Sequence, residues 1–269
     1  MKFKIKAVKD ICIAGKTIMC SLKSTSGNHK GKRGERKNIT PEQVRKNNDR
    51  LALRNLTAIL NANFKKGDLH VVLTYKNEAD KNTAMKTYDK FIRALRAAMR
   101  KEDKELSYVH VIECEHKRLH HHVVINVSDI KLLTDLWEYG FVKATPLDGT
   151  GDYSKLAAYL LKETQKTFRT GENPYKKRYT TSKNIKRPEI VRVEIDPEEL
   201  FEDPAPLKGY YIPKELCRRF EHPVTGIEHL EYTMVALGKP IKYKIWPFGE
   251  IISGREFYKP TYDEEQLIL

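Results

Sequence analysis

The sequence predicts an α+β protein in which helices pack on a mostly antiparallel central sheet. Segments with strand-like alternation take turns with segments of helical spacing through residues 65–195. A polar turn joins two neighbouring strand segments, as antiparallel pairing requires. The order along this stretch is β-α-β-β-α-β-α, which is typical of a sheet with helices packed on it.

The first part of the chain is expected to hold a hairpin, a basic linker and a helix. Residues 1–23 alternate as a β-hairpin with a turn near Gly15. Residues 24–37 have hardly an apolar side chain, which is typical of a linker. Thr40 then caps a helix, and its apolar face continues to about Phe64.

The central part supplies the sheet and most of its helices. A polar turn at 115–118 separates two β-branched segments, so these are expected to form an antiparallel pair. Apolar residues at helical spacing mark the intervening helices. We expect strands at 68–75, 107–113, 120–127 and 141–145, and helices at 85–99, 130–139 and 153–166.

The last part is expected to be a small appendage. Its predicted elements are a strand at 189–195, a Pro-bearing acidic connection at 196–206, a helix at 214–220 and a strand at 230–236. These patterns divide the chain into residues 1–64, a central domain at 65–195 and an acidic C-terminal appendage at 196–269. An interaction or specificity role is the natural expectation for the appendage.

Composition excludes several classes of protein. The chain has 269 residues, of which 40% are hydrophobic and 32% charged, so a collagen-like repeat or a wholly disordered chain is excluded. No stretch approaches the roughly 18 uncharged apolar residues of a membrane helix, and the first residues do not build a signal-peptide core. The four cysteines form no CxxC pair, which fits a reducing cytoplasm.

The charge is strongly basic and unevenly distributed. Fifty Lys and Arg against 36 Asp and Glu give a formal charge of +14. Residues 194–269 hold nine basic and fifteen acidic residues, a net of −6, which leaves +20 for residues 1–193. The excess is concentrated at 30–66 and 165–192. A polyanion is the expected partner, and nucleic acid is the commonest one.

The sharpest motif is the run His120-His121-His122 at the head of a predicted strand. Because strand side chains alternate, His120 and His122 point to one face and His121 to the other. Two imidazoles so placed can hold one divalent ion, with Glu113 on the preceding strand as third ligand and Glu115 in reserve. A His/His/Glu set with open positions suits Mg²⁺ or Mn²⁺ acting on a phosphate.

Two other interpretations of the histidines stay open. Neighbouring histidines occur in surface tracts, without a metal. Alternatively, a zinc site could form from Cys114, His116, His120 and His122. Cys114 and Glu113 point to opposite faces of a regular strand, so both cannot be ligands without a bulge.

A second motif lies in the helix predicted at 153–166. Lys155, Tyr159 and Lys162 share one helix face by their spacing. Cations beside a phenol favour the phenolate, which is a nucleophile. A tyrosine nucleophile together with a histidine-bound divalent ion describes transesterification on a phosphodiester, although each motif alone is common by chance.

These residues resemble the HUH endonucleases, specifically the single-tyrosine rolling-circle replication initiators of bacterial plasmids and phages. The strand motif is matched by HVVLTY at 70–75, and the His–hydrophobe–His motif by His120 and His122, with His121 in the usually apolar middle place. The YxxK helix motif is matched by Tyr159 and Lys162. The resemblance covers about residues 30–195.

The resemblance implies a fold and a mechanism. The fold would be a ferredoxin- or RRM-like sheet, and Tyr159 would attack a phosphate of single-stranded origin DNA to form a 5′-phosphotyrosine link. Lys162 would support the phenolate. Tyr153 lies six residues before Tyr159 and faces differently, so one nucleophile is expected. The tyrosine follows the histidines, which favours an initiator or a related single-tyrosine transposase over a relaxase.

The expected partners follow from the charge and the resemblance. Single-stranded DNA would be bound by a set of basic side chains: Lys155, Lys176, Lys177, Arg178, Lys183, Lys186 and Arg187. A host helicase and polymerase would complete replication in the cytoplasm of a bacterial host, with no membrane involved. The remaining alternative is a non-catalytic nucleic-acid-binding module, although the aromatic strand signature of RNA-binding sheets is absent from 68–75 and 120–127.

Overall fold

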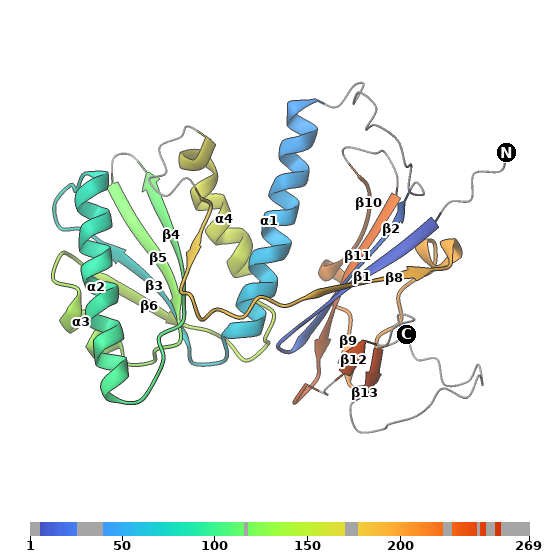
Figure 1. Ribbon diagram of the computed structural model, residues 1–269. Helices are drawn as coiled ribbons and strands as arrows, with labels where there is room; N and C mark the ends of the chain where they lie inside the picture. The colour runs from blue at the N-terminus through green and yellow to red at the C-terminus, as the bar shows by residue number, and fades with distance from the viewer. Residues whose placement is uncertain are drawn as a thin grey trace. The chain divides into compact units, whose positions relative to one another are not determined.

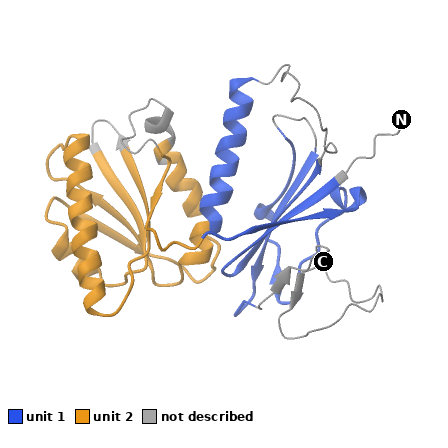
Figure 2. Ribbon diagram, viewed as in Figure 1, with its two compact units in different colours: residues 1–58, 187–269 blue, residues 59–186 orange. Residues whose placement is uncertain are grey.

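The computed structural model describes residues 6–25, 40–115, 118–169, 177–222, 228–240, 243–245 and 251–253. The chain divides into two compact units, residues 1–58 with 187–269 and residues 59–186 (Figure 2). The boundary falls near the end of α1 (Pro41–Asn63). No helix among the described residues is long and apolar enough to cross a membrane.

The unit formed by residues 59–186 is built on a five-stranded antiparallel sheet with strand order β6-β3-β5-β4-β7. Helices α2 and α3 cover one face of this sheet and α4 covers the other (Figure 1). Helices with a mostly antiparallel sheet confirm the predicted α+β class. The elements are β3 (Leu69–Thr74), α2 (Lys81–Lys101), β4 (Tyr108–Glu115), β5 (Arg118–Ile125), α3 (Ile130–Leu136), β6 (Val142–Pro146), α4 (Ser154–Arg169) and β7 (Thr180–Thr181).

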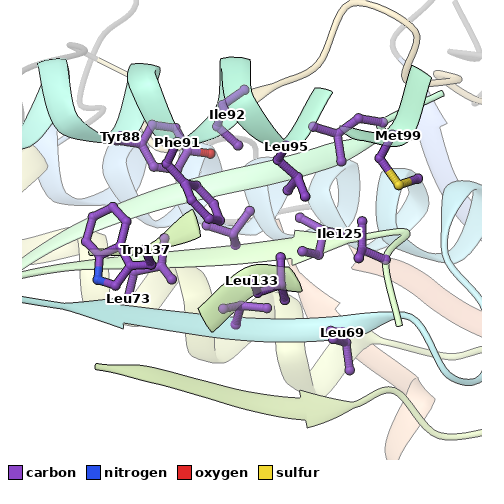
Figure 3. Close-up of a cluster of buried hydrophobic side chains, with 14 residues drawn as sticks. Leu69, Leu73, Tyr88, Phe91, Ile92, Leu95, Met99, Ile125, Leu133 and Trp137 are labelled. Atoms are coloured by element: carbon purple, nitrogen blue, oxygen red, sulfur yellow. The ribbon is translucent and has the colours of Figure 1, made fainter. Parts of the chain in front are cut away.

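The core of this unit lies between α2, α3 and the sheet (Figure 3). The α2 side chains Phe91 and Leu95 are at most 2% exposed, and they meet Leu69 and Leu73 of β3. Asp80 starts α2 by accepting hydrogen bonds from the backbone N–H groups of residues 82 and 83. Burial of alternate residues on β3 therefore leaves its other side chains for the opposite face of the sheet.

Helix α3 ends earlier than predicted. The pattern indicated a helix to Tyr139, but α3 ends at Leu136. Trp137 is 2% exposed and its indole N–H donates to the carbonyl of Thr74, 2.9 Å away. This contact turns the chain toward β6, because the indole must lie over the end of β3.

Gly140 is required at that turn, because its backbone lies directly against β3. A Cβ atom at this position would stand 2.0 Å from the carbonyl oxygen of Thr74 and 2.8 Å from Cα of Tyr75. Both neighbours are backbone atoms, so neither can move as a flexible side chain would. The end of β3 can pair with the start of β6 only if residue 140 has no side chain.

Gly140→Ala is expected to lower the free energy of unfolding of this unit by about 3 kcal/mol, measured by urea denaturation. Gly149→Ala is the control, because its new Cβ would meet only a Lys66 side-chain carbon at 3.5 Å. Equal midpoints for the two variants would contradict the assigned close approach.

The unit formed by residues 1–58 and 187–269 contains a six-stranded sheet with the path β10-β11-β2-β1-β8 and β9 paired to β11. The hairpin predicted at 1–23 is confirmed, with Gly15 at positive φ in its turn. Strand β2 pairs with β11, and β1 with β8. The strands are β1 (Lys6–Ala14), β2 (Thr17–Thr25), β8 (Ile190–Ile195), β9 (Tyr210–Tyr211), β10 (Cys217–Glu221) and β11 (Glu228–Ala236), with β12 (Tyr243–Ile245) and β13 (Ile251–Ser253) as a separate pair.

The helix predicted at 214–220 is wrong. Only Lys214–Leu216 is helical, as a single 3-10 turn, and the chain continues as β10. Residues 217–221 pair along β11 in antiparallel register. The tertiary pairing with β11 therefore overrides a short and ambiguous apolar pattern.

Glu231 is the charged centre of the second sheet. Its side chain is 8% exposed and accepts a hydrogen bond of 2.7 Å from Arg218. Arg50 of α1 forms an ion pair with the same carboxylate, and Arg54 lies 3.8 Å away. Burial raises the pKa of Glu231, but the three guanidinium groups outweigh burial and bring this pKa below its usual value.

Glu231→Ala is expected to lower the free energy of unfolding of this unit by about 3 kcal/mol or more, because it leaves buried guanidinium groups without their carboxylate. Glu228→Ala on the same strand is the control, since its side chain is 44% exposed and lies 3.9 Å from Arg219. Thermal unfolding of both variants measures the difference. A loss no larger than that of the control would contradict the role of Glu231.

Candidate functional site

The hairpin of β4 and β5 brings Glu113 opposite His120. Glu113 Oε2 accepts a hydrogen bond of 2.7 Å from His122 Nε2 and lies 3.8 Å from His120 Nδ1. Glu113 and His122 are buried, with side chains 9% and 2% exposed, and His120 is partly exposed. The structure therefore brings together the three side chains predicted as ligands on one sheet face.

His121 lies on the other face of the sheet, as strand alternation predicts. Its Nδ1 lies 2.9 Å from His110 Nε2, and its Nε2 lies 2.8 Å from the Tyr75 hydroxyl. Tyr88 of α2 stacks on both imidazole rings. Both ring nitrogens of His121 thus have partners away from Glu113, so His120 and His122 are the histidines of the site.

Burial of this second group keeps its imidazoles neutral. Burial, followed by the charges of His122 and His120, lowers the pKa of His121 to about 3. The pKa of His110 is also lowered, chiefly by burial. His121 is therefore part of a buried polar network that holds β5 against α2.

His70 of β3 is a member of the site that the sequence motifs did not single out. Its Nε2 lies 3.4 Å from His122 Nδ1, and the two rings stack with centroids 5.6 Å apart. Burial, followed by His122 and Lys143, lowers the pKa of His70 to about 4. The register pairs Val72 with His122, which places His70 one residue pair further along the same face. Pairing 68–75 with 120–127 in the sequence could have revealed it.

Helix α4 brings Tyr159 to this face. Its ring meets the His122 ring edge-on at 5.6 Å and the His70 ring at 6.0 Å. Leu160 and Leu161 are buried, so the helix packs through them while Tyr159 stays 42% exposed. The phenol is therefore held next to the histidines and remains accessible.

Lys155 and Lys162 are exposed on the same helix. Both are thus accessible to a charged ligand such as a phosphate. The role predicted for Lys162, support of the phenolate, stays a prediction.

Tyr153 differs from Tyr159 in each of these respects. It is 4% exposed and its hydroxyl donates to the carbonyl of Asp148 at 3.2 Å. Burial, together with Asp148 and Asp68, raises the pKa of Tyr153 to about 12. These properties make Tyr153 a poor nucleophile and leave Tyr159 as the accessible phenol.

The donor set suits a divalent ion, but it is not a preformed cage. Among the side chains that the structure describes, no three His, Cys, Asp or Glu groups are arranged to hold a metal ion. His122 Nε2 instead carries a proton that it donates to Glu113, because a carboxylate only accepts. Two imidazoles and a carboxylate converging on one point fit Mg²⁺ or Mn²⁺ once that proton is displaced.

The other predicted residues are distributed as follows. Lys177, Lys183, Lys186 and Arg187 are exposed, and Arg178 is half-buried. Lys176 lies outside the described residues, as do His116 and the side chains of Cys114 and Glu115. The DNA-binding set and the zinc alternative therefore stay predictions.

The fold and the site define an α+β protein whose central sheet gathers imidazoles, a carboxylate and a phenol on one face. Residues 68–168 match the family described as Replication-associated protein ORF2. The match is consistent with a rolling-circle replication initiator, and it confirms the predicted resemblance to replication proteins over this segment. The segment runs from β3 to α4 and contains the whole site. No curated protein and no solved structure matches the chain.

Proposed function

We propose that the protein initiates rolling-circle replication by nicking and rejoining single-stranded DNA at an origin. The observation that carries this proposal is the packing of the accessible Tyr159 ring against His122, which is hydrogen-bonded to Glu113. The family match over residues 68–168 supports a role in replication. A phenol beside a candidate phosphate-activating site has the composition needed for transesterification.

In the proposed reaction, the Tyr159 oxygen forms a bond to phosphorus and the bond from phosphorus to the 3′-oxygen breaks. The phenol loses its proton and the leaving oxygen gains one, so the products are a free 3′-hydroxyl and a 5′-phosphotyrosine. Attack by a 3′-hydroxyl reverses the reaction and reseals the strand. No ATP is required, because the covalent link conserves the phosphodiester.

The remaining residues of the site prepare this step. His120, His122 and Glu113 would hold Mg²⁺ or Mn²⁺, which when bound supplies Lewis-acid polarisation of a phosphate oxygen. His70 orients the His122 ring through its second nitrogen. Lys162 would balance negative charge near Tyr159 or the phosphate.

The proposed setting is the cytoplasm of a bacterial host. A host helicase would unwind the DNA and a host polymerase would extend the free 3′-hydroxyl. The cations predicted to contact DNA would bind its backbone, with an affinity that falls as salt rises.

The test is incubation of the protein with labelled single-stranded oligonucleotides tiled across its own replicon, with Mn²⁺ or with EDTA, followed by a denaturing gel. A shifted band that resists denaturation, and that EDTA abolishes, is expected for one oligonucleotide. Binding without any covalent product would indicate a non-catalytic nucleic-acid-binding module instead.

A further inference from the structure

The site continues across the sheet toward its edge strand. His120 is paired with Glu113 on one side and with Thr74 on the other. The backbone N–H of Thr74 donates to the carbonyl of Phe141 at 3.0 Å, and the Phe141 N–H lies 3.3 Å from the Thr74 hydroxyl. Phe141 therefore lies in the same row across the sheet as the metal-ligand candidates.

The next row has the same arrangement. His122 is paired with Val72, and Val72 is paired with Lys143 of β6. Strands are about 4.8 Å apart, so Lys143 lies about 10 Å from the His122 backbone. Strand β6 is the edge of its sheet, which leaves this side of the row open to a ligand.

Alternation along β6 fixes the side to which these residues point. Val142 and Ala144 pack against the core on the α2 side of the sheet. Phe141 and Lys143 therefore project to the opposite side, where His70, His120 and His122 lie. The charge of Lys143 also lowers the pKa of His70, after burial and His122, which requires the two to be near each other.

Both side chains are accessible. Phe141 is 70% exposed, although most large apolar residues of this unit are buried, and Lys143 is also exposed. A single exposed aromatic residue needs no explanation by itself. This one is in register with the site and next to an exposed cation, which is the combination that binds single strands by base stacking and phosphate contact.

We propose that Phe141 and Lys143 form a subsite for a nucleotide adjacent to the scissile phosphate of single-stranded DNA. Phe141 stacks on the base and Lys143 contacts the phosphate. The subsite rests on the proposed nicking function, since it takes the position of the bound strand from the Tyr159 site. It accepts any base, because every base offers a face for stacking.

Binding of fluorescein-labelled oligo-dT, followed by fluorescence anisotropy in the Tyr159→Phe background, tests the subsite without cleavage. Phe141→Ala is expected to weaken binding by about 5-fold to 100-fold, and Phe141→Trp to preserve it and show quenching of the new tryptophan. Lys143→Ala is expected to reduce the salt dependence by about 0.7 in the log–log slope.

Matched controls are Phe201→Ala, which removes an equally exposed ring from the other unit, and Lys86→Ala on α2. Neither is expected to change binding. Unchanged affinity of Phe141→Ala, with no quenching in Phe141→Trp, would overturn the subsite while wild-type cleavage leaves the nicking function intact. Failure of the wild-type protein both to bind and to cleave would overturn the two together.

Discussion

Tyr159→Phe is expected to abolish covalent attachment of the protein to DNA while single-stranded DNA still binds. The substitution removes only the hydroxyl oxygen, so the ring contacts with His70 and His122 remain. Without that oxygen no phosphotyrosine can form, and loss of a nucleophile lowers the rate by about a thousandfold or more. Denaturing gels measure the adduct and anisotropy measures binding.

Tyr153→Phe is the matched control for this prediction. It removes a hydroxyl from the start of the same helix region, where the group donates to the carbonyl of Asp148. The expected effect is a loss of stability of about 1 kcal/mol with the adduct preserved. An adduct formed at the wild-type rate by Tyr159→Phe would remove Tyr159 from the proposal.

Glu113→Gln is expected to lower the rate of Mn²⁺-dependent cleavage by about 100-fold or more. The amide has lost the negative charge that faces His120 and His122, and the Lewis-acid contribution of a bound ion is several kcal/mol. Isothermal titration with Mn²⁺ gives a second readout, in which the variant is expected to bind the ion more weakly than the wild type.

Glu138→Gln is the control for the loss of one carboxylate. Its side chain is 70% exposed, and it forms an ion pair with Lys90 at 4.0 Å. It is expected to bind Mn²⁺ and cleave as the wild type does. If Glu113→Gln matched this control in both measurements, the ligand assignment would be wrong, with Tyr159 still open as nucleophile.

Much of the sheet that carries the site was predictable, because its elements have clear periods. The alternation of His120, His121 and His122 predicted which rings share a face, and the hairpin register confirms that arrangement. The end of α3 was not predictable, since it depends on the indole of Trp137 reaching a carbonyl of β3. Local patterns do not contain such a long-range contact.

Pairing between distant segments explains the other differences. Strand β2 near the N-terminus pairs with β11, more than 200 residues later, and no local pattern announces a partner so far along the chain. Residues 217–221 become a strand for the same reason. His70 was missed because its importance depends on the register between β3 and β5 and not on its neighbours in sequence.

The most direct test of the central claim is to map the residue that becomes linked to DNA. The adduct is digested with nuclease and trypsin, and the nucleotide-bearing peptide is identified by mass spectrometry. Cleavage after Lys155 and Lys162 separates Tyr159 from Tyr153. We expect the nucleotide on the peptide of residues 156–162. A nucleotide on a peptide with any other tyrosine would contradict the account.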